Sequence, residues 1–305
     1  MALFSIDTNG KLDHVKENDF KLEKDIQTLT ETNLATIFGF EFVRSELSLK
    51  NFRIDTLAYD PSTGAFVIIE YKRDKNFSVI DQGYAYLSLM LNNKADFILE
   101  YNENLKKTLK RDDIDWSQSK VFFISPSFTA YQREAINFKD LPIELWEVKR
   151  YNNKSVSYTK IQTAGAQESV KTISRKDDTI EKVSQEIKIY SEQEHLLSGT
   201  DEIQELYEKF KIAFLNLGDL SVVPKKKYIA FVGDTNVVDI QIQKNALKLH
   251  INLKKGELED PKKITRDVSK LGHYGNGDYE LQVSNDDDLE YISSLIKQSK
   301  KRNQK

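Results

Sequence analysis

Early in the chain, hydrophobic positions change from a helical to a strand-like spacing. A helix is predicted over residues 20–38, because four apolar side chains fall close to one of its faces: Leu22, Ile26, Leu29 and Ile37. Residues 40–49 and 51–60 then alternate as strands do. The β-branched, largely apolar run at 65–72 predicts a strand in the middle of a sheet. The intervening DPSTG at 60–64 predicts a tight turn that joins two of these strands.

The alternation of elements continues as far as residue 153. Ser78, with Asp81 three residues further on, resembles a capping box at the start of a helix over 79–93. The other elements predicted in this half are strands at 95–101 and 120–126, a helix at 129–138 and a last strand at 142–153. This order favours an α/β fold in which a mixed sheet is flanked by helices.

The pattern changes after residue 153 and then resumes. Residues 154–192 are polar and highly charged with few aromatic side chains, so we interpret them as a connector that is partly helical toward its end. A second, smaller α+β domain of roughly 100 residues follows. Its predicted elements are a helix at 200–217, strands near 227–232, 236–243, 246–254 and 278–283, and a helix at 286–298. The expected organisation is a first domain over 1–155, a charged linker over 156–193 and a second domain over 194–305.

Length and composition agree with two folded domains. The chain has 305 residues, of which 39% are hydrophobic, with 16 Phe and 14 Tyr, so each domain has enough apolar material for a core. The absence of cysteine excludes disulfides, thiolate metal sites and cysteine nucleophiles, and it fits a reducing cytoplasm. The start lacks a signal-peptide pattern, and no apolar run approaches the roughly 18 residues of a membrane span. We therefore expect a cytoplasmic protein without a membrane partner.

Charge and histidine spacing exclude two further classes. The net charge is −3, and both halves are close to neutral, which excludes the strongly basic body of a non-specific nucleic-acid binder. Contacts to nucleic acid would have to come from a local patch. The four histidines have no metal-ligand spacing, which argues against a zinc site. The glycine-rich stretch at 272–280 predicts a turn before a strand, with a functional loop as the alternative.

Two acidic residues and a lysine carry the candidate chemistry. If the turn brings Asp60 opposite Ala65, counting back along the hairpin puts Asp55 opposite Glu70. Lys72, two residues beyond Glu70, points to the same face. Two carboxylates this close repel each other unless one is protonated or a cation binds between them, and their oxygen atoms suit Mg²⁺ or Mn²⁺. The alternative is an ordinary cross-strand ion pair.

The surroundings of these residues resemble a known family of nucleases. The string RIDTLAYDPSTGAFVIIEYKRD, followed by DQGYAYLSLM, is similar to the RecB-like and NucS-like branches of the PD-(D/E)xK superfamily over roughly residues 20–150. The resemblance implies a restriction-endonuclease-like sheet and a nuclease that cleaves nucleic acid, DNA favoured, with Mg²⁺ or Mn²⁺. It implies that Asp55 and Glu70 bind the metal and that Lys72 is catalytic. A module on the same fold that binds nucleic acid or a protein without cutting is the alternative.

The same resemblance assigns roles to further residues. It implies that Gln82 and Tyr86, four residues apart on one helical face, point into the active site. It also implies an additional acidic residue from the first helix. Glu23 matches best by position, with Glu31 and Glu46 as alternatives, although each of the three has a simpler interpretation as a solvated surface side chain.

Basic residues and the second domain complete the expectations. Arg53, Arg73 and Lys75 flank the site and are candidates for phosphate contacts. The second domain resembles a small uncharacterised domain that often follows nuclease-like domains in bacterial restriction or defence systems, which suggests a protein partner but supplies no catalytic residues. The resemblance to nucleases also suggests a homodimer. The basic side chains at 297–305 either complement the dipole of the last helix or contact phosphates.

Overall fold

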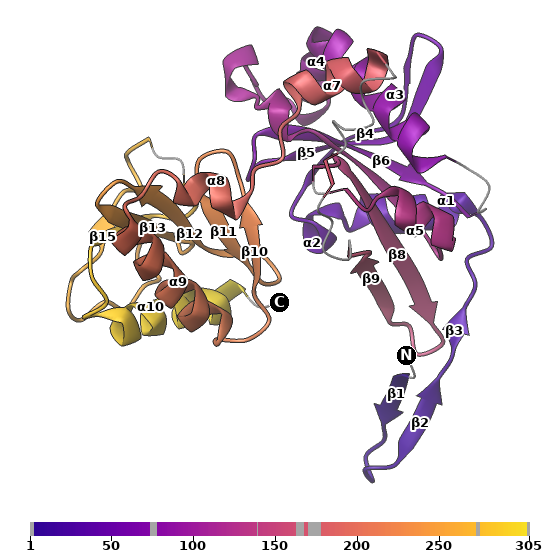
Figure 1. Ribbon diagram of the computed structural model, residues 1–305. Coiled ribbons are helices and arrows are strands. Elements are labelled where there is room, and N and C mark those ends of the chain that lie inside the picture. The colour runs from indigo at the N-terminus through magenta and orange to yellow at the C-terminus, as the bar shows by residue number, and fades with distance from the viewer. Residues whose placement is uncertain are drawn as a thin grey trace. The chain divides into compact units, whose positions relative to one another are not determined.

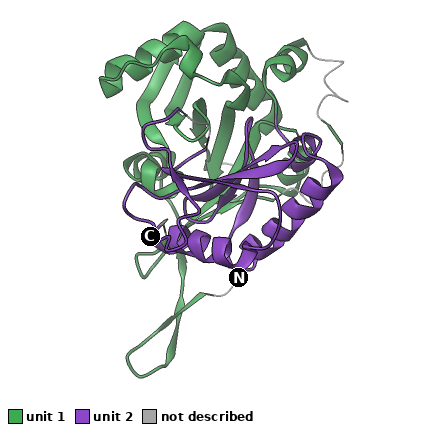
Figure 2. Cartoon of the chain, turned by 90° about the vertical axis from the view of Figure 1, so that its left-hand side faces the viewer, with its two compact units in different colours: residues 1–188 green, residues 189–305 purple. Residues whose placement is uncertain are grey.

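The chain folds into two compact units, residues 1–188 and residues 189–305 (Figure 2). We describe them from a computed structural model, which covers residues 3–73, 78–138, 140–162, 168–169, 178–272 and 275–303. Each unit has its own hydrophobic core. The expected α/β fold with a second, smaller α+β domain is confirmed.

Unit 1 is built around a mixed seven-stranded sheet (Figure 1). Its strand order is β3-β8-β7-β6-β5-β4, and β9 also pairs with β8. The pairs β6–β7 and β7–β8 are parallel and the others are antiparallel. The bounds are β3 Glu17–Asn18, β4 Glu41–Leu49, β5 Phe52–Asp60, β6 Ala65–Tyr71, β7 Lys120–Ser125, β8 Ile143–Tyr151 and β9 Val156–Lys160.

Helices cover both faces of this sheet. Alternate residues of β6 enter opposite cores: Phe66 and Ile68 pack in one, and Val67 and Ile69 pack in the other. Every residue of β6 is buried, which confirms the prediction of a strand in the middle of the sheet. The helices are α1 Glu23–Thr32, α2 Leu34–Ile37, α3 Val79–Asn92, α4 Lys94–Leu105, α5 Ala130–Ala135 and α7 Asp178–Glu186, with short 3₁₀ turns at Arg111–Asp113 and Trp116–Gln118.

Two predicted elements of this unit need correction. The strand predicted at 95–101 is wrong, because these residues lie in helix α4. Its buried side chains, Phe97 and Tyr101, are four residues apart and so share one helical face. The single helix predicted over 20–38 is divided at Asn33 into α1 and α2.

The segment expected as a linker is also corrected, because much of it packs into unit 1. Strand β9 extends the sheet through antiparallel pairing with β8. Helix α7 buries Ile180 and Val183 in the core that contains α3, and Ile187 follows them there. These apolar positions are three and four residues apart, as on one face of a helix. The boundary between the units therefore falls after residue 188, and residues 163–167 and 170–177 lie outside the described residues.

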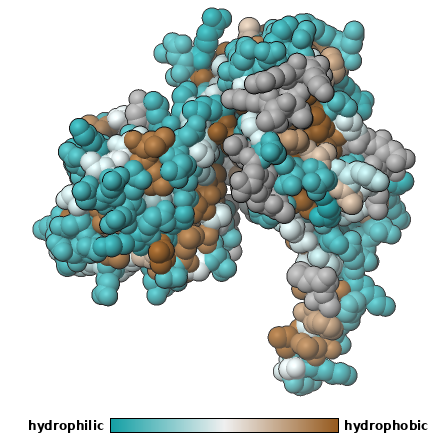
Figure 3. All heavy atoms as spheres, viewed as in Figure 1, coloured by the Kyte–Doolittle hydropathy of each residue, from teal (hydrophilic) through white to brown (hydrophobic). Residues whose placement is uncertain are grey.

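A β-hairpin that the sequence pattern did not predict precedes the sheet. Strands β1 Leu3–Ile6 and β2 Leu12–Val15 pair with each other and extend away from the sheet of unit 1 (Figure 1). The Asp7 carboxylate organises the turn by accepting hydrogen bonds from the backbone N–H groups of Asn9 and Lys11. Apolar side chains lie exposed on this hairpin (Figure 3): Phe4, Ile6 and Leu12.

Unit 2 is a six-stranded sheet with helices packed on one face. The strand order is β10-β11-β12-β13-β15-β14, and all pairs are antiparallel. The strands are β10 Ser221–Pro224, β11 Ile229–Val232, β12 Asn236–Gln243, β13 Ala246–Ile251, β14 Arg266–Asp267 and β15 Tyr279–Val283. The helices are α8 Glu192–Leu196, α9 Asp201–Leu215 and α10 Leu289–Asn303. Over the described residues of both units, no helix is long and apolar enough to cross a bilayer.

Candidate active site

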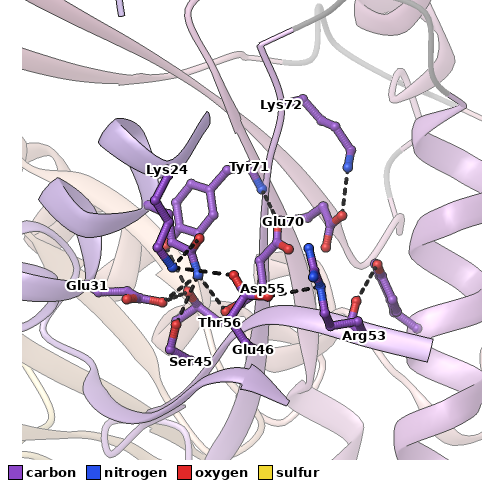
Figure 4. A network of polar contacts seen from close by, with 12 residues as sticks. Lys24, Glu31, Ser45, Glu46, Arg53, Asp55, Thr56, Glu70, Tyr71 and Lys72 are labelled. Atoms are coloured by element: carbon purple, nitrogen blue, oxygen red, sulfur yellow. Dashed lines mark hydrogen bonds and ion pairs between the residues drawn. The ribbon is translucent and has the colours of Figure 1, made fainter. Parts of the chain in front are cut away.

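The hairpin formed by β5 and β6 brings two carboxylates to one end of the sheet. Its register pairs Asp60 with Ala65 and continues to Thr56 and Ile69, as predicted. One further step along both strands sets Asp55 opposite Glu70, and Figure 4 shows the two side chains next to each other. The rest of this face is apolar and buried, so the charged groups lie at the end of a hydrophobic surface.

Asp55 is held in a position that disfavours its charge. Its Oδ2 accepts a hydrogen bond of 3.1 Å from the backbone N–H of Tyr71. Burial, followed by the negative charge of Glu70, raises the pKa of Asp55 to about 6. The Tyr71 hydrogen bond and the positive charge of Lys72 oppose this shift only in part. A cation beside Asp55 would relieve the repulsion.

Glu70 is almost fully buried, and its two oxygen atoms differ in their contacts. Oε1 lies 2.7 Å from Nζ of Lys72 and accepts a hydrogen bond of 3.1 Å from Nε2 of Gln82. Oε2 is buried and has no hydrogen-bond partner among the residues that the structure describes. A buried, unsatisfied carboxylate oxygen is costly, and a bound cation is one way to satisfy it. The pair Asp55 and Glu70 therefore fits a small oxygen-ligated cation such as Mg²⁺.

Helix α3 supplies the polar groups that border Glu70. Ser78 caps the helix by accepting a hydrogen bond from the Asp81 backbone N–H, which is one half of the predicted capping box, and the Asp81 carboxylate accepts from the Ser78 hydroxyl instead of from its backbone. Gln82 donates to Tyr86 Oη at 3.2 Å as well as to Glu70. The Tyr86 hydroxyl in turn donates to the backbone carbonyl of Arg53. Burial and then the charge of Glu70 raise the pKa of Tyr86, so its hydroxyl remains a donor at neutral pH.

Two of the candidate acids are close to this end of the sheet. Glu23, at the start of α1, accepts a hydrogen bond of 2.9 Å from the backbone N–H of Arg73, just beyond Lys72. Glu46 forms ion pairs with Arg53 at 2.9 Å and with Lys24 at 3.4 Å (Figure 4). Its charge also contributes to the raised pKa of Asp55. Neither residue has a direct contact with the Asp55 or Glu70 carboxylate among those the structure describes.

Glu31, an alternative candidate for the additional acidic residue, does not lie at the site. Its Oε1 accepts hydrogen bonds from Thr56 Oγ1 at 2.6 Å and from the Gln27 side chain at 3.0 Å. The Thr56 hydroxyl also contacts the Tyr71 hydroxyl at 3.2 Å. Because Thr56 and Tyr71 each neighbour a site carboxylate in sequence, they point to the opposite face of the sheet. Glu31 therefore stabilises that face instead of completing the site.

One positioning residue was missed in the sequence. The side-chain amide of Gln27 lies 3.0 Å from each of three acceptors: the Asp55 backbone carbonyl, Ser45 Oγ and Glu31 Oε1. Gln27 is buried, so a polar side chain between the apolar positions of the first predicted helix was the available signal. It fixes the backbone from which the Asp55 side chain extends.

The two described cations that flank the site contact nearby protein groups, and few side chains are placed to bind a metal ion. Arg53 is paired with Glu46, and the Arg73 guanidinium donates to the Lys21 carbonyl. The third flanking candidate, Lys75, lies outside the described residues. Within the described ranges, no group of three His, Asp or Glu side chains is arranged to hold a metal ion. A cation at Asp55 and Glu70 would thus keep several water ligands, as Mg²⁺ commonly does.

Sequence comparison identifies relatives whose function is not described. Residues 192–300 match the family DUF5655, a domain of unknown function, which confirms the expected uncharacterised domain in the second half. An uncharacterized protein of Haemophilus influenzae is 54% identical over 291 residues, covering 95% of this chain and 96% of its own length.

Structural comparison gives partial similarities at low scores. A repair endonuclease from Pyrococcus abyssi has a TM-score of 0.25 and 17% identity, covering 43% of this chain and 49% of its own. An EndoMS–double-stranded DNA complex has a TM-score of 0.27 and 16% identity, covering 48% and 60%. Pyrococcus furiosus SfsA in complex with Ca²⁺ has a TM-score of 0.25 and 13% identity, covering 52% and 75%. The match thus spans about half to three quarters of each of those chains.

Proposed function

This chain belongs to one family with the uncharacterized Haemophilus influenzae protein, and we propose that it is a metal-dependent nuclease that hydrolyses phosphodiester bonds in nucleic acid. The observation that carries this proposal is the buried Oε2 of Glu70, which has no partner among the described residues and lies beside Asp55, whose pKa is raised by burial and by the Glu70 charge. Such a pair is costly without a cation and suited to binding one.

Three residues would carry the chemistry. Asp55 and Glu70 would hold Mg²⁺ or Mn²⁺, which supplies polarisation of the phosphodiester and increases the acidity of a water molecule. Lys72 places its ammonium group 2.7 Å from Glu70 at the same end of the sheet. There it would stabilise the negative charge that develops on the phosphate oxygens.

Gln82 and Tyr86 would act as positioning residues. Gln82 fixes the Glu70 oxygen that also contacts Lys72, and Tyr86 links α3 to the backbone of Arg53 in β5. Together these hydrogen bonds hold helix and hairpin in register around the carboxylates. Glu23 and Glu46 remain the candidates for an additional acidic group, through water or after a small movement of the side chain.

The substrate and assembly follow from the resemblance to RecB-like and NucS-like nucleases. DNA is the favoured substrate, in restriction, defence or DNA processing. A homodimer, and a protein partner bound through unit 2, also belong to the proposal. With the two halves of the chain both close to neutral, a local group of cations such as Arg53 and Arg73 would have to meet the phosphates.

A cleavage assay with metal tests the proposal. Purified full chain is incubated with double-stranded DNA, single-stranded DNA and RNA in Mg²⁺, Mn²⁺ or EDTA. We expect cleavage only with metal, and its loss in Glu70→Gln and Lys72→Ala. The matched control Lys110→Ala removes an exposed lysine of the same unit and should cut normally. Cleavage that survives both site substitutions would place the activity elsewhere or in a contaminant.

Metal binding can be measured without relying on activity. Mg²⁺ at 100 times its Kd should raise the free energy of unfolding by about 2.7 kcal/mol. The rise should be absent in Asp55→Asn and Glu70→Gln and present in the control Glu103→Gln, which changes an exposed carboxylate of α4. No stabilisation of the wild type at any concentration would contradict the metal site.

The second candidate function is a nuclease-fold module that binds nucleic acid or protein without cutting. It is favoured by the lack of a three-ligand acidic group over the residues that the structure describes, and by the engagement of Glu70 Oε1 with Lys72 and Gln82. Retained nucleic-acid binding by a clean wild type that cuts no substrate and gains no stability from Mg²⁺ would support this alternative.

A further inference from the structure

The sheet of unit 2 has one apolar and one polar face. Helices α9 and α10 pack on the apolar face, where Ile240, Leu249 and Leu281 enter the core. The residues between these positions point to the other face. That face has no role in the proposed nuclease activity, and a ligand bound there would not depend on that activity.

Charged and polar residues form a continuous row across the polar face. His250 of β13 pairs with Asp239 of β12 on one side and with Glu280 of β15 on the other. Glu280 pairs in turn with Arg266 of β14. Directly paired residues share a face, so the row runs across four strands. In the next row, Gln241 of β12 pairs with Lys248 of β13.

An open pocket of about 600 Å³ lies over this face. Its lining includes Gln241, Gln243, Lys248, Arg266, Leu271 and Glu280. The volume is within the range of small-molecule sites, and the lining combines a few polar groups with apolar wall, as such sites do.

The cations of the pocket exceed its carboxylates. Glu280 lies 2.7 Å from the Arg266 guanidinium, 3.4 Å from Lys248 Nζ and 3.2 Å from His250 Nε2. Among the described residues that line the pocket, Glu280 is the one carboxylate, and it balances only one of the two permanent cations. Arg266 contacts Glu280 through one of its five N–H donors, and its side chain is 64% exposed. The lining therefore favours an anion, and arginine is well suited to a phosphate group.

Two amide groups in the pocket are available to a ligand. The side chains of Gln241 and Gln243, two residues apart on β12, make no hydrogen bond to any residue that the structure describes. Each amide offers both donors and acceptors, which is what the polar edge of a heterocyclic base requires. Leu271, 54% exposed, adds an apolar surface against which a ring can pack.

The glycine-rich stretch closes the other end of the row. The buried Asp239 accepts hydrogen bonds from Asn236 and from the backbone and side chain of Asn276, so it is satisfied within the fold. A Cβ at Gly275 would overlap the His250 ring, which explains the glycine there. The predicted turn before β15 therefore acts as a wall of the row, while residues 273–274 lie outside the described residues.

We propose that the pocket of unit 2 binds a nucleoside phosphate. Lys248 and Arg266 hold the phosphate group. Gln241 and Gln243 hydrogen-bond to the base, and Leu271 packs against it. The glutamines, and not the cations alone, set the preference for a nucleoside phosphate over other anions.

Calorimetric titration of the full chain tests this proposal. The probes are the four ribonucleoside monophosphates, the corresponding nucleosides and inorganic phosphate. We expect at least one monophosphate to bind, and both its nucleoside and inorganic phosphate to bind at least about tenfold more weakly. Arg266→Gln and Lys248→Gln should each weaken binding by about tenfold or more, since each removes a charged hydrogen-bond donor. Lys254→Gln removes an exposed lysine outside the pocket and should bind as the wild type does.

A further variant distinguishes loss of binding from loss of folding. Gln241→Leu removes an amide that has no partner in the described structure, so it should leave thermal unfolding unchanged while weakening binding of the monophosphate. Binding that persists in Arg266→Gln, Lys248→Gln and Gln241→Leu would overturn the proposal. It would also be overturned if no monophosphate binds, if inorganic phosphate binds as tightly as the nucleotides, or if only a longer oligonucleotide binds.

Discussion

The side-chain amide of Gln82 donates a hydrogen bond of 3.1 Å to Oε1 of Glu70, from helix α3 into the end of strand β6. The same amide lies 3.2 Å from the Tyr86 hydroxyl. Oε1 is therefore fixed by Gln82 and Lys72, while Oε2 has no partner among the described residues. This arrangement orients one oxygen of a buried carboxylate, and the other is the oxygen that the proposed cation would bind.

Replacing Gln82 should weaken the site without unfolding the protein. We expect Gln82→Leu to lower the affinity for Mg²⁺ or the kcat of cleavage by roughly 10–100-fold, because groups that orient a metal-ligating carboxylate have effects of this size. KM should change little. Tyr86→Phe, which retains the ring but removes the hydroxyl that links Gln82 to the Arg53 carbonyl, should have a smaller effect in the same direction.

The control for this prediction is Gln193→Leu, an exposed glutamine in α8 of unit 2. Isothermal titration with Mg²⁺ and steady-state cleavage kinetics give the two readouts. Unchanged values in Gln82→Leu would mean that the hydrogen bond to Glu70 has no part in the function.

Asp55 should give the metal-free protein a characteristic dependence on pH. Its folded pKa, raised from 3.8 to about 6 by burial and by Glu70, means that the folded chain binds this proton more tightly than the unfolded chain does. The contribution is therefore favourable at low pH and is lost as the pH rises from about 4 to about 6, by up to about 3 kcal/mol.

Denaturant unfolding across this pH range, in EDTA, measures the effect. The difference in unfolding free energy between wild type and Asp55→Asn should become less favourable to the wild type up to about pH 6 and then remain constant. Saturating Mg²⁺ should reduce the slope, because the cation favours the ionised carboxylate. A flat difference from pH 4 to 7 would mean that neither burial nor the charge of Glu70 raises the pKa of Asp55 in the folded state.

The sequence was most informative where local patterns determine the structure. The hairpin register follows from one turn, Asp60 to Gly64, and a period of two, so the positions of Asp55 and Glu70 could be derived. Gln82 and Tyr86 could be assigned to one face of a helix because they are four residues apart, whereas their position at the site was implied by the resemblance to nucleases. Which additional acid approaches the site could not be derived. That depends on long-range packing of α1 and on a distortion in β4, where Glu46 has a φ of +53°.

Three features were hard to predict because their structure depends on packing and not on local pattern. Helix α7 has only a short stripe, Ile180 and Val183, and it becomes stable because that stripe packs on α3. The hydrophobic run at 95–101 predicts a strand, yet it forms part of helix α4, because hydrophobic character does not distinguish a helix from a strand over so short a length. The polar row of unit 2 could not be predicted from the sequence, since its members come from four strands that only the sheet brings together.

The corrected boundary predicts how the chain can be divided. A fragment of residues 1–188 should fold on its own, because it keeps β9 and α7, whereas 1–155 loses both. Without α7, the core loses Ile180, Val183 and Ile187, and burial of side chains of this size contributes about 1.5–3 kcal/mol each. We expect fragment 1–188 to show a cooperative thermal transition and 1–155 to aggregate or melt at a much lower temperature. Equal stability of the two fragments would return the boundary to residue 155.

Lys300 should stabilise unit 2, and the basic tail should not contribute phosphate contacts. Nζ of Lys300 donates to the backbone carbonyls of Leu217, at 2.7 Å, and of Gly218, just beyond the end of α9. A charged hydrogen bond of this kind contributes about 1.5–3 kcal/mol, so Lys300→Met should lower the free energy of unfolding by about that amount. Lys301→Met, an exposed neighbour on the same helix, is the matched control and should have no effect.

The variant Lys301→Met also tests the two interpretations of the tail. Arg302 is paired with Glu257 at 3.1 Å, so two of the tail cations already have partners within unit 2. A lysine that binds a phosphate contributes about one unit to the log–log salt dependence of nucleic-acid binding, so its removal would flatten the slope by that much. We expect the slope to remain that of the wild type in Lys301→Met, measured by fluorescence anisotropy with labelled DNA across a salt series. A slope reduced by about one unit would mean that this helix end binds the nucleic-acid backbone.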